Sequence, residues 1–386
     1  MSATRSSAYD GINDDRSFFD QVKVHLGDKM PNFSQTLNIA VIGKVSGGKS
    51  SLINAILKLS RKQALDVAQV GAVAGVTKNL KILKLDDKVC LIDSPGLDDV
   101  RAENSQVTQD FLKHIDIGIF VITGASDASQ KRNLDQLREY CDSVFVVLNK
   151  VDEWDDLHPS ALTEVIEQWK TALGVEKIYP TCARGYDPKS VSSKMDIRGV
   201  YQLRTDIEEF LQKKGKDLLL ARHMAEKSGY AVKIISATLV VVAGEAFIPG
   251  SAAWITATQG SAITALNYVY TGEVLPQQAV LSILPTFVAQ TAGQNLFLFV
   301  KSFLPPTGVI DIAAAAVAVG VTLALLATVN HVLSTGAKLD EAEVLASTFK
   351  IYRKHASSTF KKIALTDVKD LPAWAELVTK FLKLPV

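Results

Sequence analysis

The stretch that most constrains this chain is Gly43–Ser50, which reads Gly-Lys-Val-Ser-Gly-Gly-Lys-Ser. An apolar, strand-like run at 37–42 precedes it, and a helix-like run at 51–62 follows it. In a glycine-rich turn between a strand and a helix, successive backbone N–H groups point inward, and the helix N-terminus adds partial positive charge. Lys49 would then reach the outer phosphates, and Ser50 would offer its hydroxyl to Mg²⁺. The stretch therefore predicts a nucleoside triphosphate site.

Strand-like and helix-like runs alternate through the first half of this 386-residue chain. Strands are predicted at 37–42, 80–85, 89–92, 117–122, 144–148 and 178–181, and helices at 50–62, 106–114, 130–141, 160–173 and 201–214. Such alternation predicts a three-layer α/β domain with a mostly parallel sheet, whose ligand lies at the C-terminal ends of the strands. We expect this domain at 35–216, after an N-terminal helical segment at 1–34 and before an all-α helical domain at 217–386.

The residues that would bind the metal follow from two further segments. The run at 89–92 ends in Asp93-Ser94-Pro95-Gly96, an Asp-x-x-Gly pattern. Its carboxylate reaches Mg²⁺ through water, and the Gly96 N–H can sense the γ-phosphate. Thr77 is the one threonine in the segment 63–79, so it is the candidate switch threonine; the alternative is a threonine that only caps the next strand. The predicted metal-binding residues are Ser50, Thr77 and Asp93.

The identity of the nucleotide's base is predicted by Asn149-Lys150-Val151-Asp152, an Asn-Lys-x-Asp pattern that follows the strand at 144–148. Guanine presents its N1–H and its N2 amino group side by side, and the Asp152 carboxylate can accept hydrogen bonds from both. Adenine offers no such pair of donors, so Asp152 predicts guanine. We expect Asn149 to contact N7 and brace the loop, and the stem of Lys150 to lie along the ring plane.

In this order and spacing, the motifs resemble those of P-loop GTPases of the translation-factor-related class, over about residues 35–215. The stretches at 43–54 and 93–99 are similar to those of immunity-related and dynamin-like GTPases and of Era- and TrmE-type GTPases. Ser46 stands where dynamin-like proteins carry serine and potassium-activated TrmE-type enzymes carry asparagine, which weakens the case for activation by potassium. The resemblance implies an enzyme that binds GTP or GDP with Mg²⁺ and hydrolyses GTP.

The last predicted strand ends in Thr181-Cys182-Ala183, which resembles the Thr-Ser-Ala loop whose backbone N–H meets guanine O6, with Cys182 where serine is usual. The predicted nucleotide-binding residues are Gly43, Ser46, Gly47, Gly48, Lys49, Ser50, Ser51, Asn149, Lys150, Asp152, Cys182 and Ala183. The predicted catalytic residues are Lys49, Thr77 and Gly96.

Leu97 follows the Asp-x-x-Gly pattern at the position where Ras-like proteins carry a water-orienting glutamine. Because an apolar side chain cannot position water, we expect slow hydrolysis unless another group stabilises the transition state. A second copy of the chain is a source of such a group. We therefore expect activation through a homodimer or a nucleotide-dependent oligomer.

The second half of the chain has a different texture, with no charged residue at 246–272 or at 274–300. The run at 312–329 is long enough, at about 18 residues, to be a candidate membrane span. Its leucine, isoleucine and valine content supports insertion by only on the order of 3–4 kcal/mol. We therefore favour a buried helix in an alanine-rich bundle. Amphipathic patterns at 339–355 and 371–384 favour packed surface helices over helices lying in a membrane interface.

A second resemblance covers part of this half. The stretches at 246–250, 258–259, 270–272 and 304–308 are similar to the Ala/Gly-rich YcjF-like domain that is attached to several bacterial GTPases. The resemblance implies a location at or near a membrane, and it names no activity. It leaves insertion and peripheral contact open.

Composition sets the remaining expectations. The formal net charge of +1 gives no overall reason to bind nucleic acid, which counts against the alternative of an Era-like switch acting on RNA or ribosome assembly. Three cysteines without a Cys-x-x-Cys pattern indicate a reducing compartment. The polar N-terminus lacks the apolar run of a secretory signal, so we expect a cytoplasmic protein. Membrane association through the helical domain and a membrane-integral GTPase stay open as alternatives.

Overall fold

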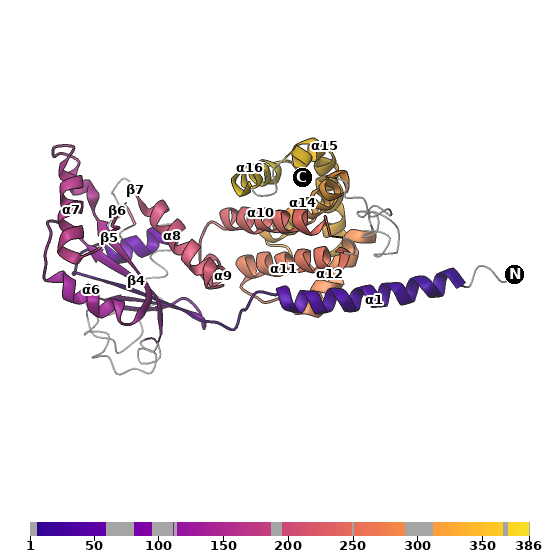
Figure 1. Ribbon diagram of the computed structural model, residues 1–386, viewed down its shortest axis with the longest axis horizontal. Coiled ribbons are helices and arrows are strands. Elements are labelled where there is room, and N and C mark those ends of the chain that lie inside the picture. The colour runs from indigo at the N-terminus through magenta and orange to yellow at the C-terminus, as the bar shows by residue number, and fades with distance from the viewer. Residues whose placement is uncertain are drawn as a thin grey trace. The chain divides into compact units, whose positions relative to one another are not determined.

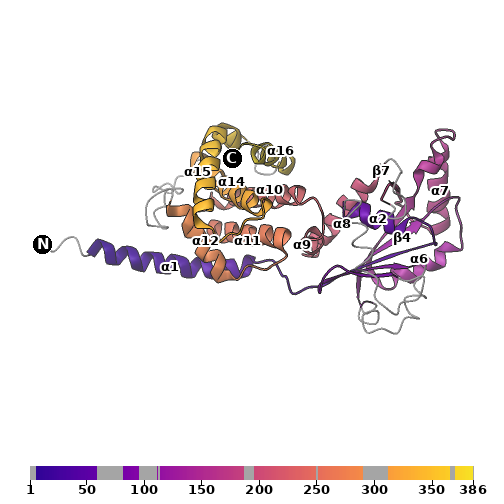
Figure 2. The same ribbon diagram turned by 180° about the vertical axis from the view of Figure 1, so that it is seen from behind.

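The computed structural model describes residues 6–58, 81–94, 111, 114–186, 195–248, 251–289, 312–365 and 370–385. The chain divides into two compact units, one over 34–226 and the other built from 1–33 together with 227–386 (Figures 1 and 2). The first unit extends past the charged run at 213–217.

The first unit is built on a seven-stranded sheet. Its strands are β1 (Leu37–Gly43), β2 (Lys81–Lys84), β3 (Val89–Ser94), β4 (Ile115–Ile122), β5 (Cys141–Asn149), β6 (Tyr179–Arg184) and β7 (Asp196–Arg198). They lie in the order β2-β3-β1-β4-β5-β6-β7. The five central strands are parallel, and β2 and β7 pair antiparallel at the two edges. The carboxyl ends of β1, β3, β5 and β6 therefore meet at one edge of the sheet.

Helices pack on the sheet, as Figure 1 shows for α6 and α7. The helices in the described part of this unit are α2 (Lys49–Ile56), α6 (Gln130–Arg138), the 3₁₀ helix η1 (Val151–Trp154), α7 (Ala161–Leu173), α8 (Val200–Lys213) and α9 (Asp217–Ala221). All eight residues of β4 are buried, which is typical of a parallel strand covered on both faces. Side chains from α6 and α7, such as Leu134 and Trp169, share one core with Ile42 and Phe120. The predicted fold class, a mostly parallel α/β sheet followed by a helical part, is confirmed.

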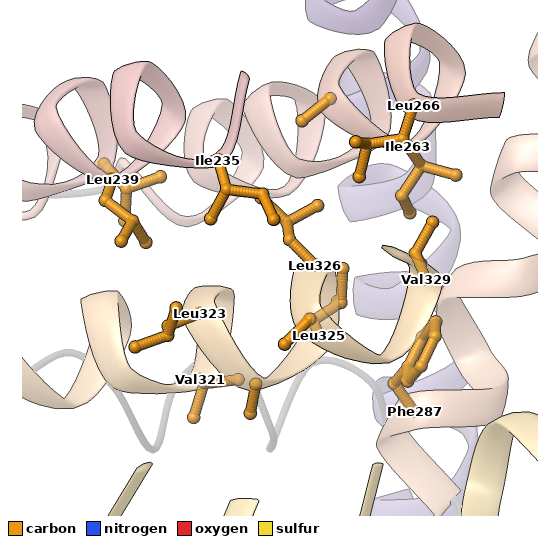
Figure 3. Close-up of a cluster of buried hydrophobic side chains, with 14 of the residues drawn as sticks. Ile235, Leu239, Ile263, Leu266, Phe287, Val321, Leu323, Leu325, Leu326 and Val329 are labelled. Carbon is orange, nitrogen blue, oxygen red and sulfur yellow. The ribbon is translucent and has the colours of Figure 1, made fainter. Parts of the chain in front are cut away.

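The second unit is helical in its described residues. It contains α1 (Ser6–Lys29), α10 (Ser228–Glu245), α11 (Ala252–Thr271), α12 (Gln277–Ala289), α14 (Ile312–Ser334), α15 (Ala342–Leu365) and α16 (Leu371–Leu382). Fifteen of the twenty residues of α11 are buried, so α11 is a core helix. Figure 3 shows side chains from α10, α11, α12 and α14 converging in this core, among them Leu239, Ile263, Phe287 and Leu326.

Among the residues that the structure describes, two helices of this unit are long and apolar enough to cross a membrane by length and composition, α10 and the 315–334 part of α14. The α14 segment is 83% buried inside the unit. Thr322 and Thr328 lie in the core and donate hydrogen bonds to the carbonyl oxygens of Ala318 and Ala324 one turn back. This is how a core helix satisfies small polar side chains. The segment packs as the buried helix that its composition favoured.

The N-terminal helix α1 belongs to this unit, although the sheet unit lies between α1 and the other helices of the unit in sequence. Its apolar face, with Phe18, Val22 and Leu26, is buried in the same core as α11 and α14. Lys29 at its end donates hydrogen bonds to the carboxylate of Glu245 and, at 2.5 Å, to the hydroxyl of Thr258. The helical unit therefore depends on residues from both ends of the chain.

Replacing Leu26 by alanine should lower the free energy of unfolding of the helical unit by about 2–5 kcal/mol. Leu26 is fully buried, and its side chain lies where a Cβ on Gly260 of α11 would meet it at 3.1 Å, so the cavity forms at a close helix crossing. The helical circular dichroism signal followed through a urea titration measures the effect. Val24→Ala is the control on the same helix, because Val24 is 64% exposed and its loss should cost less than about 0.5 kcal/mol. Equal effects of the two substitutions would contradict the packing of α1.

Candidate nucleotide-binding site

The loop between β1 and α2 has backbone geometry that only certain residues allow. A Cβ on Gly43 would lie 2.1 Å from the carbonyl oxygen of Val121 on the neighbouring strand β4. Ser46 and Gly48 adopt left-handed φ values of 66° and 78°. A side chain at Gly48 would also meet Asn149 Nδ2 at 2.5 Å. The loop therefore keeps its glycines because β4 and the Asn149 loop approach it closely.

The loop ends at the N-terminus of α2, where Gly48 is the capping residue and no side chain caps the helix. The first N–H groups of a helix have no partner within the helix, and together with the helix dipole they favour an anion. Ser51 lies half-buried in the first turn. The turn is therefore suited to a phosphate group.

Lys49 is folded into the loop. Its ammonium donates hydrogen bonds to the carbonyl oxygens of Gly43 at 2.9 Å and Lys44 at 3.1 Å, and it lies 3.6 Å from Asp93 Oδ1. Its side chain is 9% exposed. A buried cation needs such partners, and they hold the ammonium at the position that a phosphate oxygen would meet.

The two described candidates for metal binding lie in contact. Ser50 at the start of α2 donates a hydrogen bond of 2.6 Å from its Oγ to Asp93 Oδ2 at the end of β3. The register of the parallel pair, with Val41 opposite Asp93, brings this carboxylate to the loop. A hydroxyl and a carboxylate are hard oxygen donors, the type that Mg²⁺ prefers. These two residues therefore fit a magnesium ion, which would supply positive charge to the phosphates.

Asn149 links the phosphate loop to the base-reading loops. Its Nδ2 donates to the carbonyl oxygens of Gly47 at 2.9 Å and Gly48 at 3.4 Å. Its Oδ1 accepts a hydrogen bond of 3.1 Å from Thr181 Oγ1 on β6. Asn149 and Thr181 are both buried. Asn149, at the end of β5, therefore contacts both the phosphate loop and strand β6, which is the arrangement that a bracing role needs.

Asp152 is held by two residues of strand β6. Cys182 Sγ donates to Asp152 Oδ1 at 3.2 Å, and Arg184 Nη1 lies 3.6 Å from Asp152 Oδ2. Burial raises the pKa of the Cys182 thiol to about 11, so the thiol keeps its proton at neutral pH and can donate. Lys150, with a left-handed φ of 65°, makes the sharp turn that leads to Asp152. Ala183 is buried beside Cys182.

Three contacts of this site involve residues that were not predicted. Thr181 contacts Asn149 and Arg184 contacts Asp152, and the signal for both is their place within and directly after the Thr-Cys-Ala stretch. The third is an ion pair of 2.7 Å between Lys44 Nζ in the loop and Asp127 Oδ2 before α6, for which no sequence pattern exists. The hydrogen bond from Lys44 lowers the pKa of Asp127 to about 2. The predicted residues Thr77, Gly96 and Leu97 lie outside the described residues.

A strand, a glycine-rich turn and a helix N-terminus, together with a serine, an aspartate and an Asn-Lys-x-Asp loop at the same sheet edge, define a P-loop GTPase domain. A family model described as 50S ribosome-binding GTPase matches residues 38–150. Residues 38–150 are thus similar to a family of GTPases.

Two curated relatives illustrate the likeness. The chain is 27% identical to GTPase Der of a Nitratiruptor species over 170 residues, which cover 41% of this chain and 36% of Der. It is 29% identical to the Fe(2+) transporter FeoB of Helicobacter pylori over 157 residues, which cover 39% of this chain and 23% of FeoB. The chain therefore spans about a third or less of the length of these relatives.

Solved structures are more distant. The G domain of the T. maritima FeoB iron transporter is 18% identical to this chain, and the match covers 46% of this chain and all of the FeoB domain, with a TM-score of 0.28. A chain of an oligomerised bacterial dynamin pair is 13% identical to this chain, and the match covers 95% of this chain and 73% of the dynamin chain, with a TM-score of 0.30. At these TM-scores neither likeness bears on function.

Proposed function

We propose that this protein binds GTP and hydrolyses it to GDP and phosphate with Mg²⁺, slowly when it acts alone. The observation that carries the proposal is the arrangement around Asn149. This side chain ties the phosphate loop to strand β6, whose Cys182 and Arg184 hold the Asp152 carboxylate. A triphosphate cradle and a guanine-type carboxylate are thereby held at one edge of the sheet.

Each residue has a role in this proposal. The N–H groups at the start of α2 and the Lys49 ammonium bind the phosphates and stabilise the charge that develops on them during transfer. Ser50 and Asp93 would hold Mg²⁺, whose charge assists that stabilisation. Asp152 accepts hydrogen bonds from guanine N1–H and N2. Thr77 and Gly96 are proposed to contact the γ-phosphate.

We further propose that hydrolysis is stimulated by assembly of two or more copies, because Leu97 stands where a water-orienting glutamine would be expected. In that case the rate of phosphate release per molecule should rise several-fold as protein concentration is raised from below to above the dissociation constant of the assembly. Steady-state phosphate release over a roughly 100-fold range of protein concentration, about 0.1 to 10 μM, tests this. A rate per molecule that stays flat, with no change in mass by light scattering, would contradict activation by assembly.

The helical unit is proposed to act at an anionic membrane surface while the protein remains cytoplasmic. Helix α15 carries five cations in sequence, at Lys350, Arg353, Lys354, Lys361 and Lys362, and one acidic residue, Glu343. Lys350, Arg353 and Lys354 are exposed, and Ile351 between them is an exposed apolar residue. A helix that presents cations and an exposed aliphatic side chain while burying its other face is typical of binding to anionic lipid.

Reversing two of these charges, in Lys350→Glu with Lys354→Glu, should weaken binding to phosphatidylserine-containing vesicles by at least about tenfold, because each cation near such a surface contributes about 1 kcal/mol. Co-sedimentation with vesicles of mixed phosphatidylserine and phosphatidylcholine measures the effect. Lys84→Glu with Lys213→Glu, two exposed lysines of the sheet unit, is the matched control. Unchanged sedimentation of the α15 variant would exclude this face. If the parent protein binds the mixed vesicles no better than vesicles of phosphatidylcholine alone, binding to anionic lipid is excluded altogether.

A second candidate function is a switch in ribosome assembly, which the description of the matching family, 50S ribosome-binding GTPase, favours. The net charge of +1 gives this candidate no general electrostatic support. Sedimentation with ribosomal subunits in the presence of GTP and GDP distinguishes the two. Nucleotide-dependent and salt-sensitive cosedimentation would favour the ribosome over the membrane.

A further inference from the structure

The edge strand β7 of the sheet unit carries an arginine that forms an ion pair with the segment after the Asn-Lys-x-Asp loop. In β7, Arg198 donates two parallel hydrogen bonds to one carboxylate, from Nη1 to Asp155 Oδ1 at 2.8 Å and from Nη2 to Asp155 Oδ2 at 2.7 Å. Nη2 also donates to Asp196 Oδ2 at 2.8 Å. Such a two-pronged contact fixes orientation as well as distance, which a lysine could not do.

Both ends of this contact lead directly to residues of the predicted base site. Asp155 follows the 3₁₀ helix η1, and its backbone N–H donates to the carbonyl oxygen of Asp152 at 3.3 Å. On the other side, β7 pairs antiparallel with β6 so that Arg198 lies opposite Cys182. Cys182 in turn donates to the Asp152 carboxylate. Arg198 therefore connects the segment that follows Asp152 with strand β6, and both of these contact Asp152.

The loop that carries Asp152 needs such support. Lys150 adopts a left-handed conformation, which is unfavourable for a residue with a side chain. The η1 helix that follows has only four residues, Val151–Trp154, and of these only Val151 is buried. Hydrogen bonds from Arg198 lower the pKa of Asp155, so the carboxylate stays ionised and the contact persists at neutral pH.

We propose that Arg198 is a positioning residue that sets the selectivity of this site for guanine. It does not touch the nucleotide. It acts through Asp155 and β6 to hold both oxygens of the Asp152 carboxylate in line with N1–H and the N2 amino group. The inference rests on the proposed GTP site and adds to it a specificity determinant that lies outside the nucleotide motifs.

The test compares GDP with inosine diphosphate, which keeps N1–H and lacks the 2-amino group. A carboxylate held in line gains two hydrogen bonds from guanine and one from hypoxanthine, so the parent protein should bind GDP more tightly. In Arg198→Ala the GDP affinity should fall by about threefold to fivefold while the inosine diphosphate affinity changes less, as expected for loss of a partly exposed ion pair with good geometry. Calorimetric titration of the full chain with Mg²⁺ measures both affinities and hence their ratio.

Three further variants sharpen the result. Arg198→Lys keeps the charge and loses the fork, so its ratio should resemble that of Arg198→Ala. Asp155→Asn weakens the same contact from the other side and serves if Arg198→Ala does not fold. Arg138→Ala, which removes an exposed arginine paired with Asp135, is the matched control and should leave the ratio unchanged.

The outcomes separate the two proposals. One outcome is that the parent protein prefers GDP and that Arg198→Ala and Asp155→Asn keep the same ratio of GDP affinity to inosine diphosphate affinity. This outcome would overturn the role of Arg198 and leave the GTP site intact. A parent protein that binds neither diphosphate would overturn the proposed function itself. A smaller ratio of GDP affinity to inosine diphosphate affinity in Arg198→Ala, at an unchanged melting temperature, supports the positioning role. Simple destabilisation of the fold would lower the affinities for both diphosphates alike.

Discussion

Replacing Lys49 by alanine is expected to lower the affinity for GTP by at least about 100-fold. The ammonium is held at the phosphate loop by the carbonyl oxygens of Gly43 and Lys44, and phosphate oxygens would be its partners in the complex. Hydrogen bonds to charged groups contribute about 1.5–3 kcal/mol each, so the loss of two reaches this magnitude. Calorimetric titration of the variant with GTP and Mg²⁺ measures it.

The control for this substitution is Lys213→Ala, which removes an exposed lysine from the last turn of α8. It should leave GTP affinity within about twofold of the parent value, as for most surface substitutions. The melting temperature of both variants shows whether the fold persists. A folded Lys49→Ala variant that still binds GTP tightly would contradict the assignment of the phosphate loop.

Replacing Asp152 by asparagine is expected to exchange the preferred base from guanine to xanthine. The carboxylate accepts two hydrogen bonds from guanine, whereas the carboxamide oxygen accepts from N1–H only, and the carboxamide NH₂ meets the guanine amino group donor to donor, so that these two groups are left unpaired. Xanthine carries a carbonyl oxygen at that position and accepts this hydrogen bond. GTP affinity should fall by at least about 100-fold and XTP affinity should rise by a comparable factor.

Competition between labelled GDP and unlabelled GTP or XTP measures the exchange. The matched control is Asp156→Asn, since Asp156 is an exposed aspartate four residues further along the chain. It should retain the preference for guanine. Loss of GTP binding without gain of XTP binding would indicate that Asp152 supports the loop and does not read the base.

Much of the sheet unit was predictable because its signals are local. The strands β1, β4 and β5 each contain a continuous run without polar side chains, at 39–42, 117–122 and 144–148, and the helices between them follow turn residues. The phosphate loop and the Asn-Lys-x-Asp loop are contiguous in sequence, so their residues could be named without knowing the fold. The contact between Ser50 and Asp93 then required only that β1 and β3 be neighbours.

Other features depend on pairings that a sequence pattern does not record. The strand β7 has three residues, too few for a periodic signal, and its antiparallel register alone places Arg198 opposite Cys182. The ion pair of Lys44 with Asp127 joins residues 83 positions apart. The docking of α1 on α11 joins segments that are 229 positions apart at the contact of Lys29 with Thr258. Such contacts follow from tertiary packing, which local propensity does not determine.

The most direct test of the central claim is a calorimetric titration of the parent protein with GTP and, separately, with ATP, both with Mg²⁺. A cradle for phosphates with a carboxylate that reads guanine predicts one GTP bound per chain and an affinity for ATP at least about 100-fold weaker, since adenine leaves the carboxylate of Asp152 without its two donors. Equal affinities for the two nucleotides, or no binding of GTP, would contradict the account.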